Sequence, residues 1–314
     1  MSKKETISRL VDKYQSDIVK VNDTVWGFAE PGMKEYKTAE FYESFFKEKG
    51  FKVSSGLADM PTAFIAEWGS GKPVVGFLGE FDALPTLSQE AACPEKKPIV
   101  PGAYGQGCGH NSLGAGAAGA AMAFRDYLEE NHLSGTVRFY GCPGEEYGSG
   151  KVFMARAGLY DDLDVCLTWH PGDMNKVSTT SSLANISVMF SFNGVSAHAA
   201  ANPYLGRSAL DAVELMNVGV NYLREHIIPE ARVHYAYVDA GGIAPNVVHD
   251  HATIHYFIRA PKMTQAQAIF ERVKDVAWGA AKMTGTTYTV NLKEAIFDYN
   301  PNRTLEKVME KAFE

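Results

Sequence analysis

The pattern of apolar and polar positions predicts alternating helices and strands in the first 182 residues. Apolar residues recur at helical spacing over residues 5–28 and over Thr38–Lys49, which predicts two helices. Short apolar runs predict strands at residues 51–53, 63–68, 74–80, 136–141 and 164–170. Helical stretches separate the last three of these strands, and that order indicates a parallel sheet. The small residues of 112–123 predict a helix that packs tightly.

After residue 182 the pattern changes. Alternating apolar and polar residues predict strands at 185–193, 233–238, 252–259 and 287–292, with helices at 206–225 and 264–283. The order β-α-β-β-α-β is that of a ferredoxin-like sandwich. We therefore expect an α/β domain whose first part is residues 1–182 and an inserted ferredoxin-like α+β domain at 183–298. Residues 299–314, which read as a further helix, would begin the return to the first domain.

Polar side chains of metal-binding type cluster at the ends of the predicted strands and before one helix. They are Asp82, Cys108, His110, Glu145, Glu146 and His170. The carboxyl edge of an open α/β sheet is where ligands bind, so four separate segments deliver such groups to one edge. Thiolate and imidazole suit zinc and related divalent metals. A lone Cys-x-His is more typical of a buried Cys beside a loop His, and the coincidence of four segments favours a metal site instead.

The adjacent carboxylates Glu145 and Glu146 suit metal-assisted hydrolysis. In a turn their side chains point different ways, so one can bind a metal while the other accepts a proton from water and passes it to the leaving amine. The alternative is a solvated acidic turn. We interpret Asp82 as a carboxylate that orients a ligand histidine, and Glu80 is a weaker candidate ligand.

The inserted domain carries three further candidates. His198 follows an Asn-Gly turn and could donate to a developing oxyanion, although a surface histidine is the simpler interpretation. Asn246 supplies a side-chain amide in a Gly- and Pro-containing loop. Arg259, on a predicted strand, could hold a carboxylate with two hydrogen bonds.

Composition narrows the class of protein. The chain has 314 residues, of which 46% are hydrophobic and 21% charged, and its net charge is −7. Its Lys and Arg residues are scattered, which argues against binding to nucleic acid or to an anionic membrane. No apolar run approaches the roughly 20 residues that span a bilayer, and the polar start lacks a signal core, so we expect a cytoplasmic protein. The 4 cysteines are far apart and do not form a disulfide framework.

Six motifs together resemble one known family. They are GCGHN (107–111), GCPGEE (141–146), TWHP (168–171), FNGVSAHAA (192–200), LGRSALDA (205–212) and GGIAPNVV (241–248). Over essentially its whole length the chain is similar to the aminoacylase/carboxypeptidase-like dinuclear metallopeptidases, and nearest to their aminobenzoyl-glutamate hydrolase branch. The resemblance implies a parallel-sheet, zinc-peptidase-like catalytic domain with an inserted lid that also dimerises.

The resemblance also implies roles for individual residues. The metal ligands would be Cys108, as the bridging ligand, with His110, Glu146 and His170. Glu145 would be the general base, and Asp82 would support the ligands. His198 would be the lid histidine that reaches a neighbouring subunit's active site, and Asn246 and Arg259 would contact the substrate carboxylate.

Two departures from the family pattern stand out. Asn111 occupies a position where many relatives have Asp, although the aminobenzoyl-glutamate branch also has Asn there. Relatives continue well beyond position 314, and that segment supplies a last metal-binding His. The resemblance therefore implies that the second metal site is incomplete in the chain as written, so whether this chain is active without that segment stays open.

The sequence thus predicts a metal-dependent amidohydrolase that acts on a small N-acyl amino acid. The resemblance implies two divalent ions, zinc or manganese, and a reaction that converts p-aminobenzoyl-glutamate to p-aminobenzoate and glutamate. We expect a homodimer, or a hetero-oligomer with a related subunit. The alternatives are a dipeptidase on the same scaffold, and a non-catalytic subunit or binding module that needs no metal.

Overall fold

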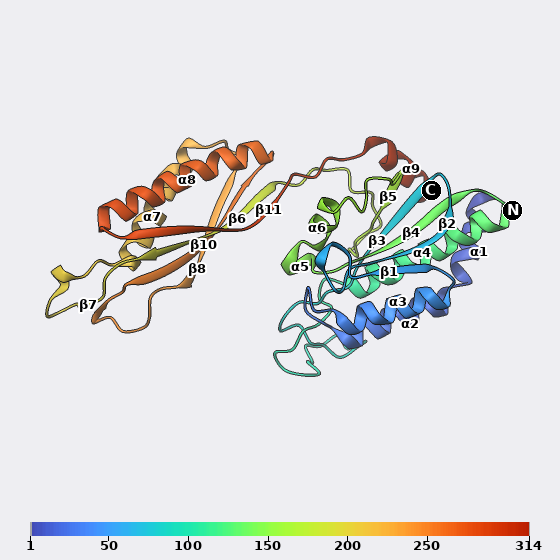
Figure 1. Cartoon of the computed structure of the whole chain (residues 1–314), viewed down its shortest axis with the longest axis horizontal. Helices are drawn as coiled ribbons and strands as arrows, with labels where there is room; N and C mark the ends of the chain where they lie inside the picture. The colour runs from blue at the N-terminus through green and yellow to red at the C-terminus, as the bar shows by residue number, and fades with distance from the viewer. Residues whose placement is uncertain (1, 314) are drawn as a thin grey trace. The chain divides into compact units, whose positions relative to one another are not determined.

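The computed structural model describes residues 2–313, which form two compact units, residues 2–175 and residues 176–313. Figure 1 shows the helices and strands of both units. None of the helices formed by the described residues is both long and apolar enough to cross a membrane.

The first unit is built on a five-stranded sheet with the order β1-β2-β4-β3-β5. Its strands are β1 (Lys52–Ser55), β2 (Phe64–Ser70), β3 (Val74–Glu80), β4 (Gly135–Cys142) and β5 (Val165–Leu167). Strand β3 pairs in parallel with β4 and with β5, as the sequence predicts. Strands β1 and β2 extend the sheet in antiparallel pairs.

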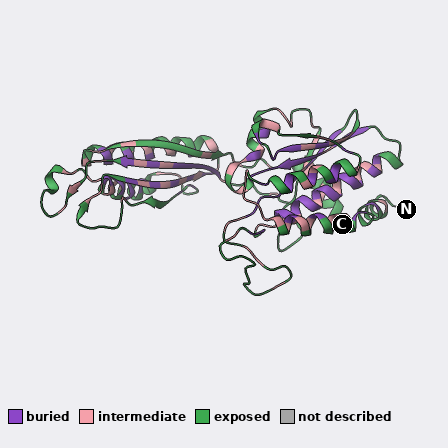
Figure 2. Ribbon diagram, turned by 60° about the horizontal axis from the view of Figure 1, so that its bottom comes forward, coloured by how far each residue is buried: buried purple, intermediate pink, exposed green. Residues whose placement is uncertain are grey.

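Helices α3 (Tyr36–Glu48) and α4 (His110–Glu130) pack on one face of this sheet, and the core there is rich in aromatic rings. Helices α1 (Lys3–Asp12) and α2 (Gln15–Phe28) pack against α4. Short elements follow β1 and β4: η1 (Leu57–Asp59), α5 (Glu145–Gly148) and α6 (Gly150–Arg156). Figure 2 shows the buried positions on the strands and on the facing sides of these helices.

The small residues before and within α4 allow it to lie directly on β3. A Cβ atom added at Gly114 would approach the Glu80 carbonyl oxygen to 2.9 Å and would overlap the Tyr42 hydroxyl. Only glycine therefore fits where α4 crosses the end of β3. This contact confirms the predicted tight packing, and it sets His110, the first residue of α4, beside the end of that strand.

The single helix predicted over residues 5–28 is wrong, because the chain breaks between α1 and α2. At the break, Lys13 Nζ and the Tyr14 hydroxyl both donate to Asp126 Oδ2 on α4, at 2.6 and 2.7 Å. A continuous helix would point these neighbouring side chains about 100° apart, since each residue advances by that angle. The helix therefore ends here, and Lys13 and Tyr14 both bind Asp126 instead of continuing it.

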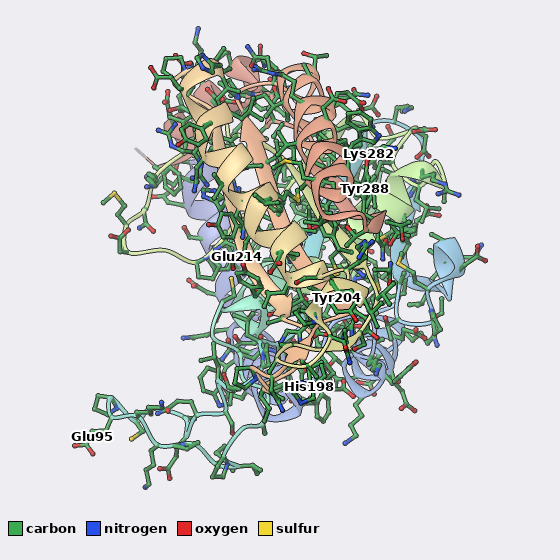
Figure 3. All side chains as sticks on the ribbon, turned by 90° about the vertical axis from the view of Figure 1, so that its left-hand side faces the viewer. Glu95, His198, Tyr204, Glu214, Lys282 and Tyr288 are labelled. Atoms are coloured by element: carbon green, nitrogen blue, oxygen red, sulfur yellow. The ribbon has the colours of Figure 1, made fainter. Side chains whose placement is uncertain are left out.

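Strand β5 is also shorter than predicted. The sequence suggests a strand to His170, but β5 ends at Leu167. Beyond it, the indole N–H of Trp169 donates to the Leu113 carbonyl on α4 at 3.0 Å. The chain therefore leaves the sheet early and carries His170 toward the start of α4. A long loop without regular structure, residues 86–104, follows β3, and Glu95 marks its outer end (Figure 3).

The second unit has the predicted β-α-β-β-α-β order. Its main elements are β6 (Ala184–Asn193), α7 (Ala209–Leu223), β8 (Arg232–Asp239), β10 (His251–Ala260), α8 (Met263–Thr284) and β11 (Thr287–Ile296). The sheet order is β11-β6-β10-β8, with every pair antiparallel, and α7 and α8 cover one face (Figure 1). The smaller elements are β7 (Ala197–His198), η2 (Pro203–Leu205), η3 (Arg224–His226), β9 (Val247–Val248) and α9 (Arg303–Phe313).

The segments that enter and leave this sheet lie side by side. The Ser182 hydroxyl accepts from the Tyr299 N–H at 3.1 Å, and Arg303 donates to the Thr179 carbonyl at 2.7 Å. An inserted domain needs such adjacent entry and exit points. That residues 299–314 begin a return to the first domain stays a prediction.

Candidate metal centre

The predicted ligands of the first unit gather at the carboxyl ends of its parallel strands. Gly109, with φ of 78°, forms the turn that joins Cys108 to His110, the first residue of α4. The Cys108 Sγ lies 3.3 Å from His170 Nε2. One ligand atom from each of Cys108, His110 and His170 lies within 4.8 Å of the others. This spacing allows the three atoms to bind a single ion of zinc type.

Asp82 connects two parts of this cluster. Its Oδ1 accepts a hydrogen bond from His110 Nδ1 at 2.9 Å, and its Oδ2 accepts from the Glu146 N–H at 2.9 Å. Burial of Asp82 opposes ionisation, but the hydrogen bonds from His110 and Glu146 outweigh it and hold its pKa below the ordinary value. With Nδ1 donating to Asp82, the neutral imidazole has its lone pair on Nε2. Asp82 therefore holds the His110 ring in one orientation and fixes the Glu146 backbone at the same time.

The turn that bears Glu145 and Glu146 is held from its other side by Glu35. This carboxylate is fully buried, and it accepts from the Gly144 N–H at 2.7 Å and from the Thr62 hydroxyl at 3.0 Å. Burial raises the pKa of Glu35. The backbone on both sides of Glu145 is thus tied to buried carboxylates.

The side chain of Glu145 remains partly exposed beside the cluster. Its Oε2 lies 3.8 Å from His110 Nε2, and its side chain keeps 42% exposure. Burial of the carboxyl group, with the negative charge of Glu80 nearby, raises the pKa of Glu145. A carboxylate with a raised pKa that still meets solvent suits a general base.

Cys108 lies among carboxylates, and this affects its protonation. Burial, followed by the hydrogen-bonding carboxylate of Glu146 and the charges of Glu145 and Glu80, raises the pKa of Cys108 to about 12. The thiol is therefore protonated at neutral pH in the protein alone. A divalent cation reverses this preference because it deprotonates a thiol that coordinates it.

Several polar atoms in this region are buried without a hydrogen-bond partner within residues 2–313. They are His110 Nε2, Glu80 Oε2 and Glu146 Oε1. Burying such atoms unpaired is costly, and a cation bound among them would remove that cost. The residues therefore fit a divalent metal: a thiol, two imidazoles and acidic oxygens face one another.

The three candidates from the inserted domain belong to the second unit. His198 lies in β7, is exposed (Figure 3), and its Nδ1 accepts from the backbone N–H groups of Ala200 and Ala201 at 3.3 and 3.2 Å. Asn246 is adjacent, because its carbonyl accepts from the Ala199 N–H at 2.9 Å. Arg259 is separate from this pair. It lies near the far end of β10, about 26 Å along the strand from His251 at a rise of ~3.3 Å per residue.

The sequence did not point to Glu35 or Lys151, and it indicated Glu80 only as a weaker candidate ligand. Glu35 could not be recognised from the sequence, because a glutamate just before a predicted helix is usually exposed to solvent. Lys151 follows a Ser-Gly pair, and nothing in that pattern indicates a role at the site. In the structure its Nζ lies 2.5 Å from Glu80 Oε1. Glu80 was only a weaker candidate, although its place as the last residue of a buried strand is the same signal that identified Asp82.

The fold and this centre define the class of protein. Residues 76–310 match the model of peptidase family M20/M25/M40, and the chain belongs to that family. Among relatives, it is 51% identical to a p-aminobenzoyl-glutamate hydrolase subunit of Escherichia coli (strain K12), over 93% of this chain and 61% of that protein. It is 30% identical to an Xaa-Arg dipeptidase of Mus musculus, over 96% of this chain and 69% of the relative. The chain thus spans less than two thirds of the length of the E. coli hydrolase subunit.

Solved structures agree on the fold. An aminobenzoyl-glutamate utilization protein from Klebsiella pneumoniae matches with a TM-score of 0.72 and 20% identity, covering 96% of this chain and 81% of that one. The YXEP protein of Bacillus subtilis, described as a dinuclear metal binding peptidase of the M20 family, matches with a TM-score of 0.69 and 20% identity, over 96% and 80%. The α/β fold class predicted from the sequence is confirmed, as is the resemblance to this family.

Proposed function

We propose that this protein is a metal-dependent amidohydrolase that cleaves the amide bond of an N-acyl amino acid. The preferred substrate is p-aminobenzoyl-glutamate, which yields p-aminobenzoate and glutamate. The observation that carries this proposal is the convergence of Cys108, His110 and His170 within 4.8 Å, beside the partly exposed carboxylate of Glu145. The 51% identity to a hydrolase subunit named for this substrate supports the choice of acyl group.

The centre would hold two divalent ions, zinc or manganese, through Cys108, His110, Glu146 and His170. When bound, such ions polarise the amide carbonyl and make water more acidic. Glu145 accepts the proton from the attacking water and delivers it to the leaving nitrogen. Asp82 keeps the His110 ring in the orientation that offers Nε2 to the metal.

The second unit would supply the remaining groups. His198 donates to the oxygen on which charge develops, and Asn246 and Arg259 bind the carboxylate of the amino acid product. His198 and Asn246 are neighbours, whereas Arg259 lies far from them along β10. One lid could therefore supply His198 and Asn246 to one active site and Arg259 to another. This arrangement requires a homodimer or a hetero-oligomer with a related subunit, and we propose that the assembly is cytoplasmic.

The test is release of p-aminobenzoate by the metal-loaded protein, extended at its C-terminus to the length of its relatives, and by the Glu145→Gln variant of the same length. We expect turnover in the parent and a loss of at least about 1000-fold in the variant, with its metal content unchanged. Undiminished turnover in Glu145→Gln would overturn the role of Glu145 as base. The second candidate function is a dipeptidase, which the 30% identity to an Xaa-Arg dipeptidase supports. Cleavage of Xaa-Arg dipeptides in preference to p-aminobenzoyl-glutamate would favour it.

A further inference from the structure

Glu80 and Lys151 form an ion pair beside the metal centre that the proposed reaction does not use. Lys151 is the second residue of α6, and Glu80 is the last residue of β3. The Lys151 Nζ lies 2.5 Å from Glu80 Oε1. Glu80 is only 8% exposed, so this carboxylate has left water almost completely. A buried carboxylate needs such a partner, because an uncompensated buried charge is strongly destabilising.

Lys151 occupies only one of the two oxygens of Glu80. The other oxygen, Oε2, lies 3.2 Å from His110 Nε2. Neither of these two atoms has a hydrogen-bond partner within the described part of the chain, and both are buried. Because Asp82 accepts the Nδ1–H of His110, neutral His110 presents a lone pair to Glu80 Oε2. Two lone pairs that face each other at this distance need a positive charge between or beside them, which is either a proton on Nε2 or a bound cation.

A divalent cation satisfies both atoms. Donor atoms bound to one zinc ion at about 2.0–2.2 Å lie roughly 3.3–3.6 Å from one another in tetrahedral geometry, and the 3.2 Å between Oε2 and Nε2 is close to the lower value. One ligand atom from each of Glu80, His110 and Glu145 lies within 4.8 Å of the others. The ion pair with Lys151 restricts rotation of the Glu80 carboxylate, so Oε2 stays directed at His110.

We propose that Glu80 is a further ligand of the metal centre, binding through Oε2 the ion that His110 binds, and that Lys151 positions it. This inference rests on the proposed metal-dependent function, but its test measures metal binding and not turnover. Glu80 would give the centre an additional oxygen donor from β3, a part of the sheet from which the predicted ligand set takes none.

The difficulty for a test is that Glu80→Gln alone also strands the Lys151 charge next to the ion. We therefore compare it with the double variant Glu80→Gln/Lys151→Met, which removes one negative and one positive charge and leaves the net charge near the ion as in the parent. Glu67→Gln is the control, because Glu67 is a carboxylate on strand β2 of the same sheet that pairs with Arg138 at 2.6 Å, with its side chain 38% exposed. Circular dichroism and thermal melting verify that each variant is folded.

Zinc affinity is measured by chelator competition, and the visible absorption of the Co²⁺-loaded proteins reports the ligand set. We expect the double variant to bind zinc about 100-fold more weakly than the parent, with an altered cobalt spectrum, and Glu67→Gln to match the parent. A double variant that binds zinc within tenfold of the parent would overturn the inference, because Glu80 would then serve only to neutralise Lys151. If zinc binding is lost in Cys108→Ala but not in the double variant, the inference fails and the proposed function stands. If the parent itself binds no zinc or cobalt, both fail.

Discussion

His110 Nδ1 and Asp82 Oδ1 lie 2.9 Å apart, and both residues are buried. The contact raises the pKa of His110 although burial acts to lower it, because the Asp82 hydrogen bond and charge and the charge of Glu80 favour the imidazolium. It also leaves Nε2 as the ring atom that faces Glu80 and Glu145. The orientation of the histidine is therefore set by the protein before any ion binds.

Replacing Asp82 with Asn should weaken metal binding and stability together. An Asn side chain has a single oxygen, so it cannot accept from both the His110 ring and the Glu146 N–H, and its amide hydrogens would face one of these donors. We expect zinc affinity to fall about 10- to 100-fold. We expect the free energy of unfolding to fall by about 3 kcal/mol. Denaturant unfolding and chelator competition measure the two effects.

Asp162→Asn is the control for that experiment. Asp162 also pairs with a cation, Arg138, at 2.6 Å, but its side chain is 56% exposed. Water can reach the exposed Asp162 carboxylate, and Arg138 keeps its pairing with Glu67, so this variant should retain the zinc affinity of the parent and lose less stability than Asp82→Asn. Equal effects of the two substitutions would contradict the special role of Asp82.

Zinc affinity should depend on pH through the Cys108 thiol. Because its pKa is about 12, Cys108 is protonated between pH 6 and 8 and must release a proton when it binds metal. Its contribution therefore makes the zinc dissociation constant fall about tenfold for each unit of rising pH. In Cys108→Asp the ligand carboxylate is already ionised in this range, so the slope should decrease by one. Isothermal titration at three pH values gives both slopes, and identical slopes would exclude the thiol as a ligand.

Two glycine substitutions should act in opposite directions. Gly114→Ala places a methyl group against the Tyr42 hydroxyl and the Glu80 carbonyl, so it should destabilise the fold by about 1–3 kcal/mol and displace α4 from β3. Gly27, in helix α2, has nothing within 4 Å of an added Cβ. Gly27→Ala should therefore stabilise the protein by up to about 1 kcal/mol. Thermal melting of the two variants measures the difference, and a neutral Gly114→Ala would show that α4 can move away without cost.

Glu35→Gln tests how the turn that bears Glu145 is held. The Gln side chain offers one oxygen to the two donors, Gly144 N–H and the Thr62 hydroxyl, which now use both oxygens of Glu35. We expect a loss of about 1–3 kcal/mol in unfolding free energy, together with slower turnover at unchanged metal content. The exposed Glu40→Gln on the neighbouring helix α3 is the control and should change neither. Full turnover in Glu35→Gln would mean that Asp82 alone is sufficient to position the turn.

Much of the fold follows from local patterns in the sequence. Strand β3 matches its predicted residues because an uninterrupted apolar run of that length has few alternatives, and the order of elements in the second unit follows from strict alternation. The break at Lys13–Tyr14 and the early end of β5 were missed because tertiary bonds to Asp126 and Leu113 decide them. These partners are distant in the sequence, and no local pattern reports them.

The residues of the candidate site also fall into a group that the sequence predicts and a group that only the folded structure reveals. Asp82, Cys108, His110, Glu145, Glu146 and His170 could be predicted because each is a metal-competent group at the carboxyl edge of the sheet. Glu35 and Lys151 could not, since their importance lies in contacts with Gly144 and Glu80 that only the folded chain creates. How His198, Asn246 and Arg259 meet the substrate stays a prediction.

The central claim is that Cys108 lies at the heart of a metal site, and elemental analysis of the purified protein tests it most directly. We predict about one to two zinc or manganese ions per chain, lost in Cys108→Ala while circular dichroism shows the fold retained. Metal content that is unchanged without the thiol would contradict the site described above. Absence of metal from the parent after incubation with zinc and manganese would contradict the hydrolase proposal itself.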